Sequence, residues 1–177
     1  MSNFKVAVVL LLLVAIAACS RSITNTQNQP TVANTANEPR RIASVDVVKV
    51  TPQEVDIAGG SSVDATVRLK IQDGYHVNAN PPSYPYLKAT ELEISPLAGI
   101  SVAFTSYPDP ITKKFSFAEK PLAVYEGETT LTVRLKADKS VQPGKQTLAG
   151  KLRVQACDDQ VCYAPGVIDV TIPLTIR

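Results

Sequence analysis

The chain has 177 residues, which is the length of one ordinary domain with room for an additional segment. Hydrophobic residues make up 45% and charged residues 19%, a composition that excludes disorder throughout the chain. The formal net charge of +2 excludes recruitment to nucleic acid by bulk charge, and 13 prolines argue against a mostly helical protein.

The first 18 residues are organised as a secretory signal peptide. Lys5 supplies a positive charge, residues 6–16 are apolar, and two alanines precede Cys19. The apolar run is shorter than the roughly 20 residues that a membrane-spanning helix needs. An ordinary signal peptide would be cleaved near Ala18 and leave Cys19 free. Residues 16–19 resemble the bacterial lipobox, however, which implies cleavage before Cys19 and attachment of lipid to its thiol. We therefore expect Cys19 to be a membrane anchor.

Residues 19–41 are expected to be a lipidated, disordered tether. They consist mostly of Ser, Thr, Asn, Gln and Pro, with Ile23 and Val32 as the sizeable apolar residues. Such a segment buries too little apolar surface to offset the entropy of ordering it. One folded domain, residues 42–177, is expected to follow.

Alternating apolar and polar residues predict the strands of this domain, because a strand with one buried face has a period of two. The clearest stretches are residues 63–72, 130–136, 148–157 and 168–176, and weaker ones are 43–50, 91–94, 101–104 and 123–125. No convincing helical periodicity occurs after residue 20. Seven or eight short strands predict an all-β fold, an immunoglobulin-like antiparallel β-sandwich.

Prolines add two expectations about the sandwich. Pro173 lies on the polar face of the last strand and has no N–H to donate, which predicts an edge strand. The proline-containing stretches 78–88 and 107–120 are expected to be long irregular loops, the part of a sandwich where function tends to lie.

Two cysteines with four residues between them carry the most informative chemistry. Cys157 and Cys162 lie between two predicted strands, which indicates a β-hairpin with the pair at its mouth or in its loop. Opposed residues there have Cα atoms about 4.5–5.5 Å apart, which suits a disulfide. As a staple this disulfide would contribute about 2 kcal/mol at most, because the loop is short. By alternation Cys157 should point away from the core, toward solvent or a covering loop.

Spacing and compartment support redox exchange and a structural disulfide equally. An exported protein lies where disulfides persist. Asp158 and Asp159 disfavour a thiolate, so Cys157 should be a slow nucleophile. This argues against an enzyme that attacks substrates unaided, but it is compatible with a carrier attacked by a partner's thiolate. Metal binding is less supported, because two Cys without nearby His or further Cys make half a zinc site.

Three motifs resemble a known family in the order in which that family has them. Residues 157–165, CDDQVCYAP, resemble the C-x-D-x-x-C-x-x-P ending of the N-terminal periplasmic domain of the thiol:disulfide interchange protein DsbD. Residues 73–77 look like the Gly-Trp/Tyr-His strand end of that domain. Residues 115–117, followed by 122–127, resemble its aromatic loop and next strand. The similarity covers residues 45–176 approximately.

The resemblance implies an immunoglobulin-like fold and a role in electron transfer. The family's domain takes electrons from a membrane-embedded donor through a Cys pair and passes them to periplasmic thioredoxin-like proteins. Carried over, Cys157 and Cys162 would be the exchanging pair, with Cys162 forming the mixed disulfide. An aromatic cap loop shields the pair in the family, and Phe115 or Phe117 would be the shield here.

We therefore expect a free-standing, lipid-anchored, periplasm-facing carrier of the thiol-disulfide oxidoreductase type. It should need no cofactor and no metal, and it should not bind nucleic acid. Tyr163 could pack over the disulfide, whereas His76, the single histidine, is expected to be structural. The alternative is an immunoglobulin-like binding or assembly lipoprotein with an inert hairpin disulfide.

Overall fold

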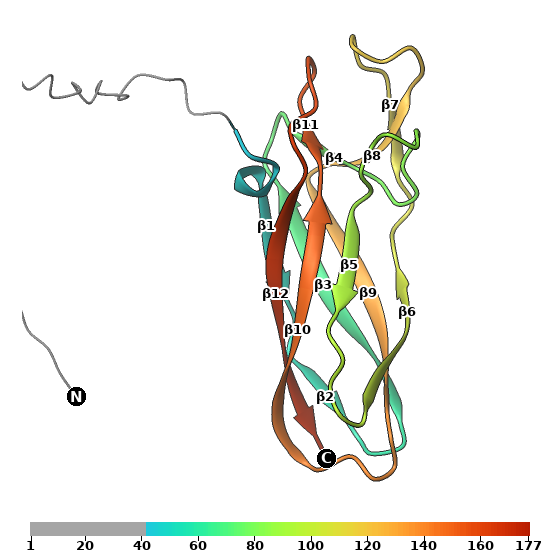
Figure 1. Ribbon diagram of the computed structural model, residues 1–177, viewed down its shortest axis with the longest axis vertical. Coiled ribbons are helices and arrows are strands. Elements are labelled where there is room, and N and C mark those ends of the chain that lie inside the picture. The colour runs from blue at the N-terminus through green and yellow to red at the C-terminus, as the bar shows by residue number, and fades with distance from the viewer. Residues whose placement is uncertain (1–41) are drawn as a thin grey trace, which may run out of the picture. The chain divides into compact units, whose positions relative to one another are not determined.

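Strands make up most of the computed structural model, which describes residues 42–177 (Figure 1). The predicted signal peptide (1–18), Cys19 and the predicted tether (19–41) lie outside the described residues. Within residues 42–177 the one helix is a single 3-10 turn, η1 (Ser44–Val47). No helix in this part of the chain is long and apolar enough to cross a membrane.

The first sheet contains four antiparallel strands in the order β1-β3-β9-β6. These are β1 (Val48–Pro52), β3 (Ser62–Ile71), β9 (Glu128–Ala137) and β6 (Ile100–Ser106). Every second residue is buried from Ala65 onward in β3 and from Leu131 onward in β9, as period-two patterning requires. Val67 lies opposite Leu131 in the register, and both are fully buried. This inner face forms one half of the main core.

The second sheet has the order β2-β12-β10-β5. Its strands are β2 (Val55–Ile57), β12 (Gly166–Ile176), β10 (Gly144–Val154) and β5 (Glu91–Ile94). β10 and β12 pair antiparallel over eleven residues, and β2 pairs parallel to the end of β12. Leu148, Leu152 and Ile172 are buried against the first sheet's side chains and complete the main core.

A third sheet of short strands lies at the end of the sandwich that is far from the C-terminus (Figure 1). Its order is β11 (Ala156–Cys157), β4 (His76–Asn78), β8 (Leu122–Tyr125) and β7 (Ile111–Lys113). A second, smaller core lies here, formed by Leu87, Phe115, Leu122 and Val124. It joins the two proline-containing loops to the third sheet.

The all-β sandwich and its eight predicted strands are confirmed, with corrections at the ends of strands. β2, β4, β7 and β11 have two or three residues each, too short for a periodic pattern to reveal them. The predicted strand 43–50 begins as η1, and the predicted strand 148–157 is interrupted at Gln155.

The edge-strand prediction from Pro173 is right for only part of β12. β2 pairs with Leu174–Ile176 and makes β12 an interior strand there. Pro173 precedes this pairing, so its missing N–H interrupts no bond to β2.

Candidate functional site

A disulfide joins Cys157 and Cys162 at the end of the hairpin that β10 and β12 form. Their Cα atoms are 3.9 Å apart and form an isolated antiparallel bridge. The two sulfur-bearing residues differ in exposure. Cys157 is fully buried, whereas Cys162 is partly exposed and lines a surface cavity of about 270 Å³.

The prediction that Cys157 could point to solvent is wrong; the second possibility, that protein covers it, holds. The alternation of β10 stops at Val154, and Gln155 separates β10 from β11. Cys157 then belongs to the third sheet, where it lies opposite His76 of β4. Residues opposite each other in an antiparallel pair present their side chains on the same face. Cys157 therefore shares a face with a fully buried histidine.

The four residues between the cysteines fold around the carboxylate of Asp158. Its Oδ1 accepts hydrogen bonds from the backbone N–H groups of Gln160 and Val161, each 2.8 Å long. Its Oδ2 accepts a 2.5 Å hydrogen bond from the Tyr163 hydroxyl. The Tyr163 bond, and then the backbone bonds, lower the pKa of Asp158. This aspartate stays ionised, and three donors hold its charge inside the loop.

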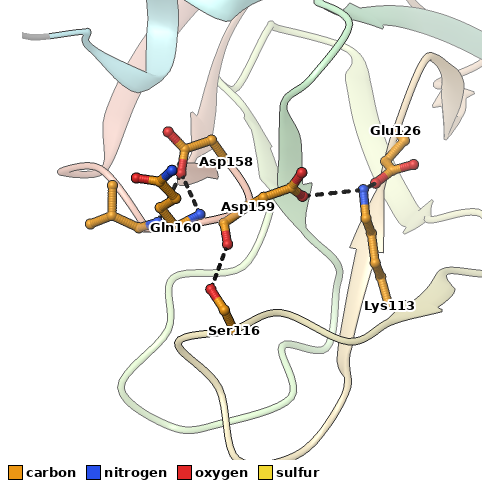
Figure 2. A network of polar contacts seen from close by, with 7 residues as sticks. Lys113, Ser116, Glu126, Asp158, Asp159 and Gln160 are labelled. Carbon is orange, nitrogen blue, oxygen red and sulfur yellow. Dashed lines mark hydrogen bonds and ion pairs between the residues drawn. The ribbon is translucent and has the colours of Figure 1, made fainter.

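Asp159 fastens the loop to its neighbours, as Figure 2 shows. Its backbone carbonyl accepts a 2.9 Å hydrogen bond from the Ser116 hydroxyl. Its carboxylate lies 3.7 Å from Lys113 Nζ, which forms a closer 2.6 Å ion pair with Glu126. Chiefly because of the hydrogen bond to Glu126, the pKa of Lys113 is raised. The loop between the cysteines is therefore joined to Ser116 by one hydrogen bond and to Lys113, at the end of β7, by one long ion pair.

His76 has no hydrogen-bond partner on either ring nitrogen, although it is fully buried. Its ring stacks on Phe115 with 4.0 Å between centroids. Burial, and then the nearby charge of Lys113, lower the pKa of His76 to about 4. A neutral imidazole with two unpaired nitrogens thus lies on the same face of the third sheet as Cys157.

Phe115 and Phe117 stack on each other at 5.4 Å but occupy different surroundings. Phe115 is 2% exposed and packs in the smaller core between His76 and the loops. Phe117 is 40% exposed and lines the same cavity as Cys162. Of the two aromatic residues predicted as a shield, Phe117 is the one beside the accessible sulfur.

Tyr163 turns toward the loop and the sheet. Its hydroxyl binds Asp158, and its ring lies 6.2 Å from that of Tyr75. The cavity beside Cys162 is lined instead by Tyr86, Leu87, Phe117, Ala118, Leu122 and Gln155. Tyr86 is 71% exposed, so the rim of this cavity offers apolar surface to solvent.

Two polar residues near the cysteines were not predicted from the sequence. Ser44 lies in η1 and hydrogen-bonds on both sides of the cysteine hairpin, to Ala156 and Ala164. Gln155 hydrogen-bonds the Tyr163 carbonyl and the Lys88 backbone N–H. Ser44 is 112 residues from Ala156 in sequence, and no local pattern signals such a contact.

Residues 42–177 contain no group of three or more His, Cys, Asp or Glu side chains placed to hold a metal ion.

Comparisons with solved structures find matches at low sequence identity. The N-terminal domain of DsbD from Neisseria meningitidis, in the reduced form, is 19% identical with a TM-score of 0.43, over 64% of this chain and 79% of that one. The N-terminal periplasmic domain of ScsB from Proteus mirabilis is 16% identical with a TM-score of 0.47, over 72% of this chain and 45% of that one. A complex of the DsbD and PilB N-terminal domains from Neisseria meningitidis gives 20% identity and a TM-score of 0.41, over 70% and 80%.

The sequence match is more decisive than these structural likenesses. No curated protein matches the chain significantly. The profile of the family described as "Thiol:disulfide interchange protein DsbD, N-terminal" matches residues 44–172, which is most of the chain and includes both cysteines of the disulfide. The chain belongs to the family of DsbD N-terminal domains.

Proposed function

We propose that this protein is a thiol-disulfide exchange protein that carries electrons between redox partners through Cys157 and Cys162. The observation that carries the proposal is the unequal exposure of one disulfide. Cys162 borders a surface cavity with an apolar rim, whereas Cys157 is fully buried. A purely structural disulfide needs no such asymmetry, whereas an exchanging one needs one sulfur that a partner can reach.

The reaction is a two-electron exchange. A thiolate of a reduced dithiol partner attacks Cys162 Sγ, forming a mixed disulfide and releasing Cys157 as a thiolate that takes up a proton. The partner's second thiolate then attacks the sulfur of the partner's first cysteine in the mixed disulfide. This forms the partner's disulfide and releases Cys162 as a thiolate that takes up a proton. The partner leaves as a disulfide, and this protein gains two electrons and two protons. The same steps in reverse reduce a second partner.

The aromatic residues have separate roles in this proposal. Phe117 limits access to Cys162, since it lines the same cavity and is only partly exposed. Phe115 stacks on His76, the residue that lies opposite the buried Cys157. Tyr163 holds the cysteine loop in shape, because its hydroxyl donates a hydrogen bond to the Asp158 carboxylate.

We further infer a periplasm-facing place in the cell envelope, with Cys19 as lipid anchor. Support comes from the signal-like residues 1–18 and from the periplasmic domain of ScsB among the similar structures. The partners are expected to be thioredoxin-like proteins and a membrane-embedded electron donor. Replacing Cys19 with Ala should abolish lipid attachment; a mature protein that begins at Cys19 without added lipid mass would contradict the anchor.

The reduction potential of the pair tests the function. The full chain carrying Cys19→Ser, purified in detergent, contains two thiols and can be equilibrated in graded thiol/disulfide buffers. A potential between about −180 and −270 mV is expected for an exchange protein. A value well below about −300 mV, reached slowly, would indicate a structural disulfide and defeat the proposal.

Trapping of the intermediate tests which sulfur is attacked. In Cys157→Ser, the accessible Cys162 should form a stable mixed disulfide with a thioredoxin-like protein or a small disulfide. In Cys162→Ser, the buried Cys157 should react far more slowly. Equal trapping by both variants would show that burial does not direct the attack.

A further inference from the structure

The backbone shifts its pairing by one residue just before the disulfide. Along β10 and β12 the register is unbroken from Gly144 opposite Ile176 to Val154 opposite Gly166. Continued for three residues, it would set Cys157 opposite Tyr163. The bridge instead joins Cys157 to Cys162. An extra residue on the β12 side is a β-bulge, and a one-residue slip changes which side chains face each other.

Two backbone hydrogen bonds belong to the slipped register. Tyr163 N–H donates to the Ala156 carbonyl at 2.8 Å, and Asp158 N–H donates to the Val161 carbonyl at 2.9 Å. They close the loop around the cysteines. Between the end of the β10–β12 pairing and the cysteine bridge, the slip also leaves backbone groups without a partner on the opposite strand. Where such groups are buried, they need other hydrogen-bond partners.

Side chains from outside the hairpin supply those partners. The Ser44 hydroxyl accepts a 2.9 Å hydrogen bond from Ala156 N–H and donates a 2.6 Å bond to the Ala164 carbonyl. One oxygen atom thus bridges the two sides of the hairpin at the point of the slip. On the adjacent residue, Gln155 Nε2 donates to the Tyr163 carbonyl at 3.2 Å.

The position of Ser44 is itself held by packing. Ser44 is fully buried, and its neighbour Val45 lies against the start of β12. A Cβ added to Gly166 would come within 2.5 Å of Val45 Cγ1, so the glycine permits this approach. The first turn of the domain is therefore fitted to the base of the cysteine hairpin.

We propose that Ser44 is a positioning residue for thiol-disulfide exchange, whose hydroxyl maintains the one-residue slip that sets Cys157 opposite Cys162. The disulfide enforces this pairing when it is intact. After reduction no covalent bond does so, and the Ser44 bridge keeps the two thiols opposed. Its loss would let the hairpin adopt the unslipped register and lower the effective concentration of one thiol at the other. The inference rests on the proposed exchange function.

The test is the equilibrium constant for disulfide formation, measured in the Cys19→Ser full chain with graded thiol/disulfide buffers. Ser44→Ala is expected to lower this constant about tenfold, because it removes two hydrogen bonds and leaves the buried N–H of Ala156 unpaired. Ser44→Thr keeps the hydroxyl and should restore most of the loss. A Ser44→Thr variant as impaired as Ser44→Ala would show that the hydroxyl is not responsible.

Ser61→Ala is the matched control, because the Ser61 hydroxyl also donates to a backbone carbonyl, that of Ala58, but in an exposed turn. It should leave the constant unchanged. The free energies of unfolding of the oxidised and reduced forms distinguish a positioning role from general stabilisation of the fold. A purely structural role would destabilise both forms equally and leave the constant at its original value, which would overturn the proposal.

If Ser44→Ala does not fold, a second variant tests the proposal. Gln155→Met removes the bond to the Tyr163 carbonyl, together with the bonds that Gln155 Oε1 accepts from Lys88 N–H and Asn78 Nδ2, and should lower the constant about threefold. No change in a folded Gln155→Met variant would show that side chains beside the slip do not position the thiols, and it would overturn the proposal in that case. A wild-type protein that fails to exchange with any buffer would defeat the proposed function itself. Normal exchange with an unaffected Ser44→Ala variant would defeat only the role of Ser44.

Discussion

The body of the sandwich and its cysteine end are built by different rules. In the body, β3, β9, β10 and β12 are ten or eleven residues long and bury alternate side chains over most of their length. β3 pairs with β9, and β10 with β12, in continuous register. At the cysteine end the strands have two to four residues, the register slips, and side chains satisfy backbone groups. Regular pairing supplies stability, while irregular backbone leaves one sulfur accessible and the other covered.

This contrast predicts that loss of a large side chain has different consequences in the two regions. Phe115→Ala should lower the free energy of unfolding by about 3–5 kcal/mol, since Phe115 is 2% exposed in the smaller core. It should also speed reduction of the disulfide by a small thiol, because cover is removed near the buried Cys157. Denaturant unfolding and thiol-reduction rates measure the two effects.

Leu131→Ala is the matched variant in the body. Leu131 is fully buried in the main core, and its loss should cost about 2–5 kcal/mol. The reduction rate, measured well below the unfolding midpoint, should stay unchanged. If both variants accelerate reduction alike, global destabilisation explains the rate and the two regions do not differ as described.

His76 should give the cysteine end a pH dependence that the body lacks. Its pKa is lowered from 6.5 to about 4, by burial first and Lys113 second, with Glu126, Asp159 and Asp158 acting in the opposite direction. Between these pH values the unfolded chain binds a proton that the folded chain does not, so stability falls as pH drops from 6.5 toward 4. The loss should be on the order of 2–3 kcal/mol.

His76→Leu should flatten this dependence and keep stability at pH 7 close to that of the wild type. The reason is that both ring nitrogens lack partners, so an apolar residue removes no hydrogen bond. Urea unfolding at a series of pH values is the measurement. An undiminished slope in His76→Leu would assign the acid sensitivity to other groups.

The smallest effect is expected from the partly exposed ion pairs of Lys113, at the end of β7. Lys113→Met removes contacts to Glu126 and Asp159, but the side chains are a third or more exposed. The free energy of unfolding should change by less than about 1 kcal/mol, and by less still at high salt. The pKa of His76 should rise, because the Lys113 charge lowers it.

Lys114→Met is the control for this charge. Lys114 is exposed and donates only to the carbonyls of Ala118 and Glu119. It should leave the pKa of His76 unchanged in an NMR titration. Equal shifts in both variants would mean that general surface charge, rather than the position of Lys113, acts on the histidine.

The sequence alone determined the long strands and the pairing of the two cysteines. Alternation over ten residues reports a buried face reliably, and cysteines separated by four residues between two strands lie within reach of each other. The family was also recognisable from sequence motifs alone.

Tertiary structure decided how the cysteine end is arranged. The burial of Cys157 follows from its transfer to the third sheet after Gln155. At the register slip, Ala156 hydrogen-bonds Ser44, which is more than one hundred residues away in sequence. Short strands and bulges have too few residues for a periodic signal, and contacts between distant segments stabilise them. For that physical reason, which sulfur is accessible could be established only in the folded molecule.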